Sequence, residues 1–197
     1  MTFRYIICAV LAYLLGSISS GILLTRGTGT DIRKEGSGNT GASNALRVFG
    51  MRVGLITFIC DVLKAVAAVL IGMALAGEYG GMIGGLFVII GHNWPVFFGF
   101  KGGKGIACSC AVVLFNFPIP GAIAILICIA AIALTRYISV GSMLLLISYA
   151  IILCATKTFW PYGAWAVLLA VMAIARHHGN IKRLINGTEN KLSFKKK

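Results

Sequence analysis

Charged residues are scarce in this sequence, and acidic residues are the scarcest. Only 12% of the 197 residues are charged, about half the share in ordinary soluble domains, and five of them are Asp or Glu. Hydrophobic residues reach 58%, with a mean hydropathy of +0.92. So little charge cannot cover the surface of a soluble globule, and so apolar a chain is not disordered. The composition therefore predicts an integral membrane protein.

The sequence also lacks the usual material of metal centres and disulfide frameworks. Five carboxylates leave little for a catalytic pair of acids or for an oxygen-rich metal cage. No C-x-x-C motif is present, nearly all six cysteines fall in apolar runs, and Cys108 and Cys110 would point apart on a helix. We interpret the cysteines as small apolar filling residues, and we expect neither a metal nor an organic cofactor.

Long apolar runs dominate what is present. They cover residues 3–25, 51–76, 80–98, 105–118, 119–134, 139–156 and 161–175. A helix needs about 20 residues to cross a hydrocarbon core of about 30 Å, so four of these runs are long enough. We expect the others to be half-helices or to lie in thinned bilayer. The sequence predicts an all-α, polytopic membrane protein with about seven transmembrane helices. We expect one domain over residues 1–197 and a first run that is a retained span.

The basic residues predict the orientation. The net charge is +13, and seven spans that start outside place fifteen of the eighteen Lys and Arg, including Arg52, on one side of the membrane. Arg4 and Lys157 fall on the other side, and Lys64 lies within a span. Because Lys and Arg concentrate in cytoplasmic loops, we expect the N-terminus outside and the C-terminus in the cytoplasm. Orientation explains most of the basic excess, and we expect no nucleic-acid partner.

Residues 36–47 form a polar, glycine-rich cluster on the predicted cytoplasmic side. Three glycines allow close backbone approach, and Ser37, Asn39 and Thr40 offer hydrogen-bonding groups. Arg47 adds a planar guanidinium that suits phosphate. The alternative is a flexible loop that caps the following helix.

A second cluster covers residues 91–105 and ends in Gly102-Gly103-Lys104-Gly105, directly before an apolar run. Backbone N–H groups, the helix dipole and a lysine at a helix start make an anion site. The segment is not a Walker A loop, because position 98 is Phe and Gly105 stands where Ser or Thr is required. The alternative is a glycine-rich turn with interfacial lysines.

A third cluster follows the last apolar run. His177 and Asn180 are three residues apart, so a helix would present both on one face, whereas His178 would face solvent. Histidine is the usual general acid–base near neutral pH, but a basic segment here could also simply attract anionic lipid. Within the second apolar run, Asp61 and Lys64 form either a structural ion pair or part of a functional site.

Together these motifs resemble the acyl-phosphate-dependent glycerol-3-phosphate acyltransferases, the PlsY-type bacterial membrane family, over nearly the whole chain. The matching runs are Gly16-Ser17-Ile18, Ser37-Gly-Asn-x-Gly-Ala-x-Asn44-x-x-Arg47, Asp61-x-x-Lys64, Gly91-His92-x-x-Pro95, Gly102-Gly103-Lys104-Gly105, Arg136-Tyr137-x-Ser139-x-x-Ser142, His177-x-x-Asn180-Ile-x-Arg183-Leu184 and Glu189. Any one run is weakly specific, but the ordered set is highly specific. Ala65 departs from the glycine that the family pattern has there.

The resemblance implies that a fatty acyl group passes from acyl-phosphate to the sn-1 hydroxyl of glycerol 3-phosphate, giving lysophosphatidic acid and phosphate. This would be the first step of bacterial phospholipid synthesis, at the cytoplasmic face of the inner membrane. The implied partners are the two substrates and membrane lipid, with the protein acting as a monomer. The other acyltransferase class carries His-x4-Asp, which is absent here.

The resemblance also implies the roles of individual residues. Catalysis would involve His177, Asn180, Lys104 and Ser37; phosphate binding, Arg47, Gly102, Gly103, Gly105, Ser142 and Asn39; and support, Asp61, Lys64, His92 and Glu189. Either His177 or the phosphate of the donor would deprotonate the acceptor, without a covalent acyl-enzyme; we favour the phosphate. Glu189 is interpreted as an anchor for the basic tail.

A membrane carrier or flippase for a phosphorylated lipid or a small organic phosphate is the alternative function. Such a carrier would also need basic, glycine-rich sites and broken helices. It should have polar groups at the midplane and repeated halves, and the sequence shows no internal repeat.

Overall fold

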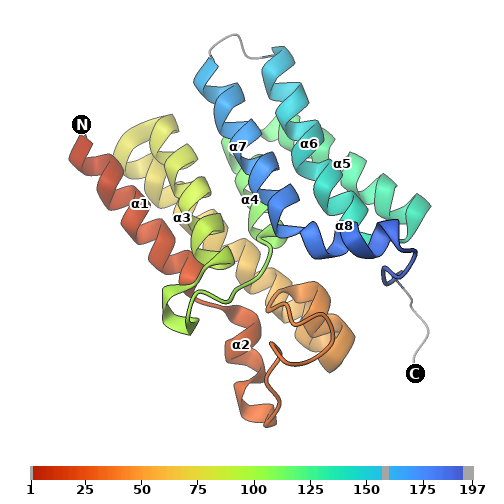
Figure 1. Ribbon diagram of the computed structural model, residues 1–197. Coiled ribbons are helices and arrows are strands. Elements are labelled where there is room, and N and C mark those ends of the chain that lie inside the picture. The colour runs from red at the N-terminus through yellow and green to blue at the C-terminus, as the bar shows by residue number, and fades with distance from the viewer. Residues whose placement is uncertain (1, 157–159, 193–197) are drawn as a thin grey trace. The chain divides into compact units, whose positions relative to one another are not determined.

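The computed structural model describes residues 2–156 and 160–192, which form helices and loops without a strand. Lys157 and the lysines at 195–197, which entered the charge pattern, lie outside the described residues. The elements are α1 (Thr2–Ser17), α2 (Ser20–Thr25), η1 (Arg26–Thr28), α3 (Ala42–Asn93), η2 (Val96–Phe98), α4 (Ile106–Asn116), α5 (Pro118–Thr135), α6 (Ile138–Thr156), α7 (Trp160–Arg176) and α8 (His178–Ile185) (Figure 1). The all-α prediction is confirmed.

Among the described residues, four helical stretches are long and apolar enough to cross a membrane, and two apolar helices are shorter. The second long stretch, Ala42–Phe98, is interrupted at Gly50 and again at Ala76 and Gly77, where the backbone leaves helical φ/ψ. Gly50 directly precedes the second predicted apolar run, and Ala76–Gly77 lies at the predicted boundary between the second and third runs. The break predicted around Pro118 also holds, since α4 ends at Asn116 and α5 begins at Pro118. The prediction of about seven apolar helices, some short or broken, is confirmed.

Two breaks differ from the sequence-based prediction. The first apolar run divides into α1 and α2, because Ile18 and Ser19 are not helical. The third run was expected to continue to residue 98, but α3 ends at Asn93. Pro95 follows, and a proline both removes a donor and disfavours the helical conformation of the residue before it. Both breaks lie beside candidate site residues.

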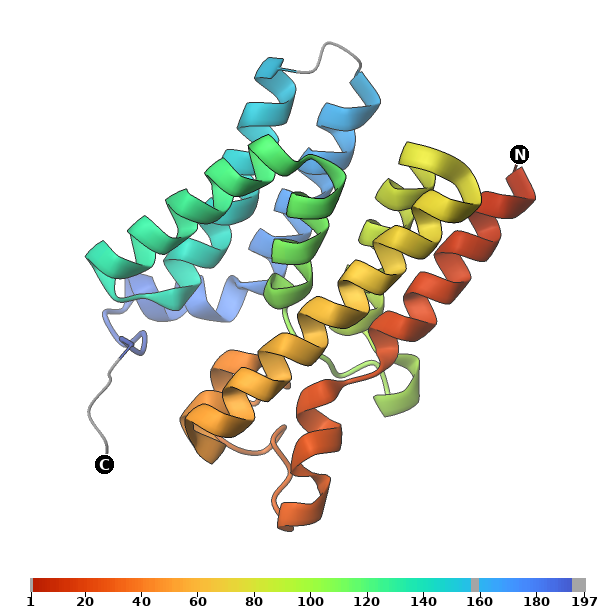
Figure 2. The ribbon, with the colours of Figure 1, turned by 180° about the vertical axis from the view of Figure 1, so that it is seen from behind.

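Backbone contacts divide the chain into two compact units, Met1–Asn116 and Phe117–Lys197, each described here by itself. One domain over residues 1–197 stays a prediction. In the first unit, α3 folds back at Gly77, whose φ of +64° suits glycine, and its two arms lie side by side (Figure 2). A Cβ on Gly72 would overlap the carbonyl oxygen of Gly80, and the reverse also holds. Small residues let these arms approach closely.

Close backbone contacts at glycines also join α1 to the second arm of α3. A Cβ on Gly16 would overlap the backbone of Val88, and one on Gly91 would overlap the carbonyl oxygen of Tyr13. α4 packs against α3 as well, where Val112 occupies the space beside Gly85. The contacts at Gly16 and Gly91 lie near the ends of α1 and α3, where the first group of candidate residues also lies.

In the second unit, α6 packs against both α5 and α7. Its Tyr149 is fully buried and stands edge-on to Trp165 of α7, with 6.1 Å between ring centroids. α8 turns away after α7 and runs crosswise to it (Figure 1). Large apolar side chains point outward, with Leu134 86% and Trp160 76% exposed. Such exposure suits helices that face lipid.

Candidate active site

The break in the first span is held by two charged residues of α3. Because α1 ends at Ser17, its last carbonyl groups lose their helical partners. The Lys64 ammonium donates to the carbonyl oxygens of Gly16 at 3.1 Å and of Ile18 at 2.7 Å. Across the break, Ser20 Oγ at the start of α2 donates to Asp61 Oδ1 at 3.0 Å. The break is therefore a fixed bend within the first unit.

Asp61, Lys64 and His92 form a buried group that we name the Asp61 cluster. Lys64 Nζ lies 2.8 Å from Asp61 Oδ1 and 3.1 Å from His92 Nδ1, and His92 Nδ1 lies 3.5 Å from Asp61 Oδ1. The three side chains are at most 7% exposed. Charges inside a membrane are costly and normally pair, as these do. The ion pair is present, and any functional role of these residues remains to be proposed.

The Asp61 cluster also bears on metal binding. Donor atoms of Asp61, His92 and Cys108 lie within 4.8 Å of one another, which is close enough for a cation. The ammonium of Lys64 already neutralises this position and contacts two of the three donors. The Cys108 thiol donates to the Asp61 carbonyl oxygen at 3.3 Å. The geometry is that of an internal ion network, and we derive no metal chemistry from it.

The glycine-rich loop 102–105 packs directly on His92. Gly103 N–H donates to the His92 carbonyl oxygen at 3.0 Å, and a Cβ on Gly103 would overlap the His92 ring. Gly105 has a φ of +77°, a backbone conformation that residues with a side chain rarely adopt. Lys104 between them is half-buried. The predicted anion loop therefore leads into α4 with a backbone conformation that requires glycine.

The polar segment 36–47 is organised by Asn44, whose role the sequence analysis left unassigned. Its Oδ1 accepts from Ser37 N–H at 2.8 Å, and its Nδ2 donates to the carbonyl oxygens of Ile32 and Glu35. Asn39 Oδ1 accepts from Gly41 N–H at 2.9 Å. The side chains of Ser37 and Arg47 are exposed. A sequence signal for Asn44 was its place at the start of a helix, where amides often bind loop backbone.

In the second unit, Glu189 collects three donors. Its carboxylate accepts from Ser139 Oγ at 2.8 Å, Asn180 Nδ2 at 2.6 Å and Arg183 Nε at 2.7 Å. Burial opposes ionisation, but these hydrogen bonds and the Arg183 charge outweigh it and lower the pKa of Glu189 below its ordinary value. The ionised carboxylate thus joins α6 to α8 through Ser139, Asn180 and Arg183, and its role as an anchor for the basic tail stays a prediction.

His177 and Asn180 are both buried, at 2% and 7% exposed, but not on one continuous helix. His177 caps α8, and the helix begins at His178, which is exposed. The His177 Nδ1 atom lies 2.8 Å from the carbonyl oxygen of Ala173. A carbonyl oxygen only accepts, so Nδ1 carries the hydrogen, and Nε2 is the acceptor atom of the neutral ring.

Two further features of the second unit concern the sequence prediction. Ser142 is buried, and its hydroxyl donates to the Ile138 carbonyl oxygen within α6.

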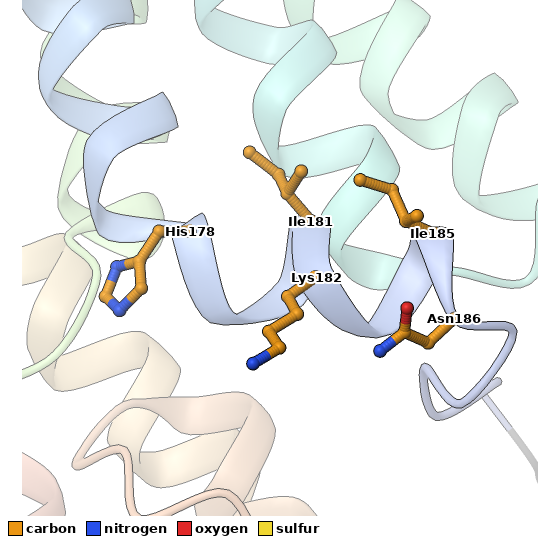
Figure 3. A pocket seen from close by; sticks show the side chains of 5 residues that line it. All are labelled: His178, Ile181, Lys182, Ile185 and Asn186. Atoms are coloured by element: carbon orange, nitrogen blue, oxygen red, sulfur yellow. The ribbon is translucent and has the colours of Figure 1, made fainter.

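A shallow groove on α8 is lined by His178, Ile181, Lys182, Ile185 and Asn186 (Figure 3). Ile181 and Ile185 project to one side of the helix, and Lys182 and Asn186 to the other (Figure 3). This two-faced pattern is typical of a helix at a membrane surface.

The structure thus gathers Asp61, Lys64, His92 and Gly103 in the first unit, and Ser139, Asn180, Arg183 and Glu189 in the second. Ser20, the partner of Asp61, was not among the residues predicted from the sequence. The signal was available, because three serines at 17, 19 and 20 interrupt an apolar run, and all three are buried.

Comparison with known proteins identifies this arrangement. The glycerol-3-phosphate acyltransferase family model matches residues 6–187. A glycerol-3-phosphate acyltransferase of Thermoanaerobacter pseudethanolicus is 45% identical over 194 residues, covering 96% of both chains. One of Clostridioides difficile is 42% identical over 201 residues, covering 98% of both.

Solved structures agree with the sequence relatives. The integral membrane glycerol 3-phosphate acyltransferase PlsY (YgiH) has crystal structures in a glycerol 3-phosphate form and a lysophosphatidic acid form. The chain matches the first with a TM-score of 0.90 and 34% identity, over 96% of both chains. It matches the second with a TM-score of 0.87, at the same identity. The chain belongs to the glycerol-3-phosphate acyltransferase family and is an integral membrane acyltransferase of the PlsY type.

Proposed function

We propose that this protein transfers a fatty acyl group from acyl-phosphate to the sn-1 hydroxyl of glycerol 3-phosphate. The products are lysophosphatidic acid and inorganic phosphate, and the reaction is the first step of bacterial phospholipid synthesis. The observation that carries the proposal is the match, at a TM-score of 0.90, to a PlsY structure in its glycerol 3-phosphate form. The related lysophosphatidic acid form supports the assignment of the product.

The glycine loop is the proposed site for the phosphate of glycerol 3-phosphate. Gly102, Gly103 and Gly105 bring backbone close to the ligand, Lys104 supplies charge, and the first N–H groups of α4 follow. The Asn93 amide is fully buried, faces Gly105, and has no hydrogen-bond partner among the residues that the structure describes. A polar group at this loop supports a polar ligand.

The remaining phosphate contacts are proposed from the residue types. The exposed guanidinium of Arg47 can bind a phosphate with two parallel hydrogen bonds, and Ser37 and Asn39 offer further donors. In the second unit, the Ser142 hydroxyl donates within its helix and can still accept a hydrogen bond. We assign these residues to the two substrate phosphates together.

Acyl-phosphate is already activated, so the protein needs to position and stabilise rather than form a covalent intermediate. The acceptor oxygen forms a bond to the acyl carbon, the acyl carbon–phosphate oxygen bond breaks, and the hydroxyl proton passes to the departing phosphate. Positioning and charge stabilisation can supply most of such a rate enhancement. Lys104 and Arg47 are the proposed cations that stabilise the developing phosphate charge.

His177 and Asn180 are proposed to orient the acceptor hydroxyl. With its hydrogen on Nδ1, a neutral His177 offers Nε2 as an acceptor. Asn180 is held by its hydrogen bond to Glu189, which fixes the orientation of the amide. A His177→Gln variant with near-normal kcat would exclude His177 as an essential base, whereas a fall in kcat of about 100-fold or more would favour it over the donor phosphate.

The protein is proposed to work in the bacterial inner membrane, with its N-terminus outside and its reactive loops facing the cytoplasm. The support is the placement of fifteen Lys and Arg on one side of the predicted spans. The two-faced α8 supports a position at the membrane surface (Figure 3). The partners are glycerol 3-phosphate, acyl-phosphate and membrane lipid, and the protein acts as a monomer.

Phosphate release tests this proposal. Purified protein in lipid receives palmitoyl-phosphate and glycerol 3-phosphate, and parallel samples lack the acceptor or contain palmitoyl-CoA. We expect release that requires both substrates and that Lys104→Ala abolishes. Lys101→Ala is the matched control, because Lys101 is exposed in the same loop. No release from folded wild-type protein would contradict the proposal and favour a carrier, which flux assays would then test.

A further inference from the structure

The Asp61 cluster is a costly feature that the proposed chemistry does not use. Three ionisable side chains are at most 7% exposed within the apolar arms of α3. Removing an ion from water costs several kcal/mol, and well-packed apolar residues are often as stabilising as a buried ion pair. Stability alone is therefore a weak reason for this arrangement, and its neighbours point to another.

His92 is the member of the Asp61 cluster that contacts the glycine-rich loop 102–105. On one edge, the His92 ring contacts Lys64 Nζ at 3.1 Å and Asp61 Oδ1 at 3.5 Å. The ring also fills the space next to Gly103, and the His92 carbonyl oxygen accepts the Gly103 N–H at 3.0 Å. A shift of the His92 ring would therefore displace the backbone of the loop at Gly103.

The Asp61 cluster also reaches the start of α4 and the break in the first span. Cys108, in the first turn of α4, donates to the Asp61 carbonyl oxygen, and Lys64 binds the end of α1. His92 thus holds the loop at Gly103, and the carbonyl oxygen of Asp61 holds Cys108 where the loop continues into α4. A rigid support of this kind is what a precisely placed set of N–H donors needs.

We infer that Asp61, Lys64 and His92 are positioning residues that hold the Gly102–Gly105 loop in its phosphate-binding conformation. They set the affinity for glycerol 3-phosphate rather than the rate of acyl transfer. This inference rests on the proposed function, because it takes the loop as the site of the acceptor phosphate. Each residue acts through the loop backbone.

The test separates positioning from stability. Asp61→Asn should raise the KM for glycerol 3-phosphate about tenfold or more, with kcat and the KM for palmitoyl-phosphate within about threefold. The double variant Asp61→Asn/Lys64→Met contains no unpaired aspartate or lysine, so its Tm should recover relative to Lys64→Met. Its KM for glycerol 3-phosphate should stay raised, because the His92 ring has lost the Lys64 ammonium and faces a neutral amide in place of the carboxylate.

Thr57→Val is the matched control. Thr57 is fully buried on the same helix, one turn before Asp61, and its hydroxyl donates to the Val53 carbonyl oxygen in that helix. All kinetic constants should stay unchanged. A double variant that regains both Tm and KM would overturn the inference, as would an Asp61→Asn variant that loses kcat with an unchanged KM. If Asp61→Asn does not fold, His92→Gln decides by the same constants.

Failure of the proposed function would look different. Wild-type protein that forms no product from the two substrates would contradict that function whatever the variants do. An active wild-type protein whose Gly103→Ala variant keeps its KM for glycerol 3-phosphate would remove the loop assignment. An active protein with a sensitive Gly103 and an insensitive Asp61 and His92 would overturn the positioning inference alone.

Discussion

The two groups of polar residues hold their charges in different surroundings. The Asp61 cluster lies within apolar helices, and its side chains are at most 7% exposed. The Glu189 side chain, where the chain leaves α8, is also only 7% exposed, but its cationic partner Arg183 is 36% exposed. Water can therefore reach the cation of the second group, whereas Lys64, the cation of the first group, is 7% exposed. We infer that loss of a charged side chain from the first group destabilises the fold strongly, whereas water compensates in part for the loss of Arg183 from the second.

Removing one cation from the first group should have the largest effect. Lys64→Met leaves the Asp61 carboxylate buried without the ammonium that neutralises it, which should cost about 3–5 kcal/mol. Thermal unfolding in detergent should show a Tm lower by about 10 °C or more. A fall below about 3 °C would contradict this difference, because losing the cation of the first group would then cost no more stability than losing that of the second.

Adding one methyl group beside the Asp61 cluster should have the next largest effect, on activity. In Gly103→Ala, the new Cβ would overlap the His92 ring, which its contacts with Asp61 and Lys64 hold in place. We expect acyl transfer at low acceptor concentration to fall about 100-fold. Gly27→Ala is the control, since a Cβ there meets nothing within 4 Å. Equal rates for the two variants would show that the loop conformation is not critical.

Removing the cation of the second group should cost less. Arg183→Met leaves Glu189 with its hydrogen bonds from Ser139 and Asn180, and the guanidinium that is lost is 36% exposed, so water can take its place. We expect a loss of about 1 kcal/mol and a Tm lower by about 2–4 °C. Lys182→Met, at an exposed neighbouring position, controls for the loss of charge on α8. A fall as large as that of Lys64→Met would remove the distinction between the groups.

The smallest effect should be the pH dependence of the Glu189 contribution. The pKa of Glu189 is lowered in the folded protein, so its stabilisation is complete above the unfolded pKa of about 4.3. That stabilisation is lost as the pH falls through the folded value. The Tm difference between wild type and Glu189→Gln should therefore be constant from pH 6 to 8 and shrink on acidification below about pH 4. A difference that grows on acidification would contradict the lowered pKa.

The sequence predicted the apolar helices better than the places where they break. Ala76–Gly77 and Pro118 break helices for local reasons, namely backbone freedom and a missing donor, and both positions were expected. The break at Ile18 and Ser19 is different. It depends on Lys64 and Asp61, which bind the two broken ends from more than 40 positions away. No local pattern reveals such a partner.

The candidate site was predictable to a similar extent. Spacing along the chain suggested the Asp61–Lys64 pair and the anion loop, because these depend on near neighbours. The contact of the His92 ring with Gly103 depends on how loop 94–105 returns over α3. His177 precedes Asn180 by three residues as expected, but it takes the N-cap position of α8, where the helix that ends at Arg176 is interrupted. Ser20 was missed because its partner Asp61 lies 41 residues away, and Asn44 was missed because its contacts depend on how the preceding loop folds back onto the start of α3.

The central claim is acyl transfer from acyl-phosphate to glycerol 3-phosphate. Its most direct test is mass spectrometry of the lipid formed when purified protein in lipid receives palmitoyl-phosphate and isotope-labelled glycerol 3-phosphate. We expect labelled 1-palmitoyl lysophosphatidic acid in an amount equal to the phosphate released, and no such lipid from palmitoyl-CoA. Phosphate release without labelled lipid, or equal product from palmitoyl-CoA, would contradict it.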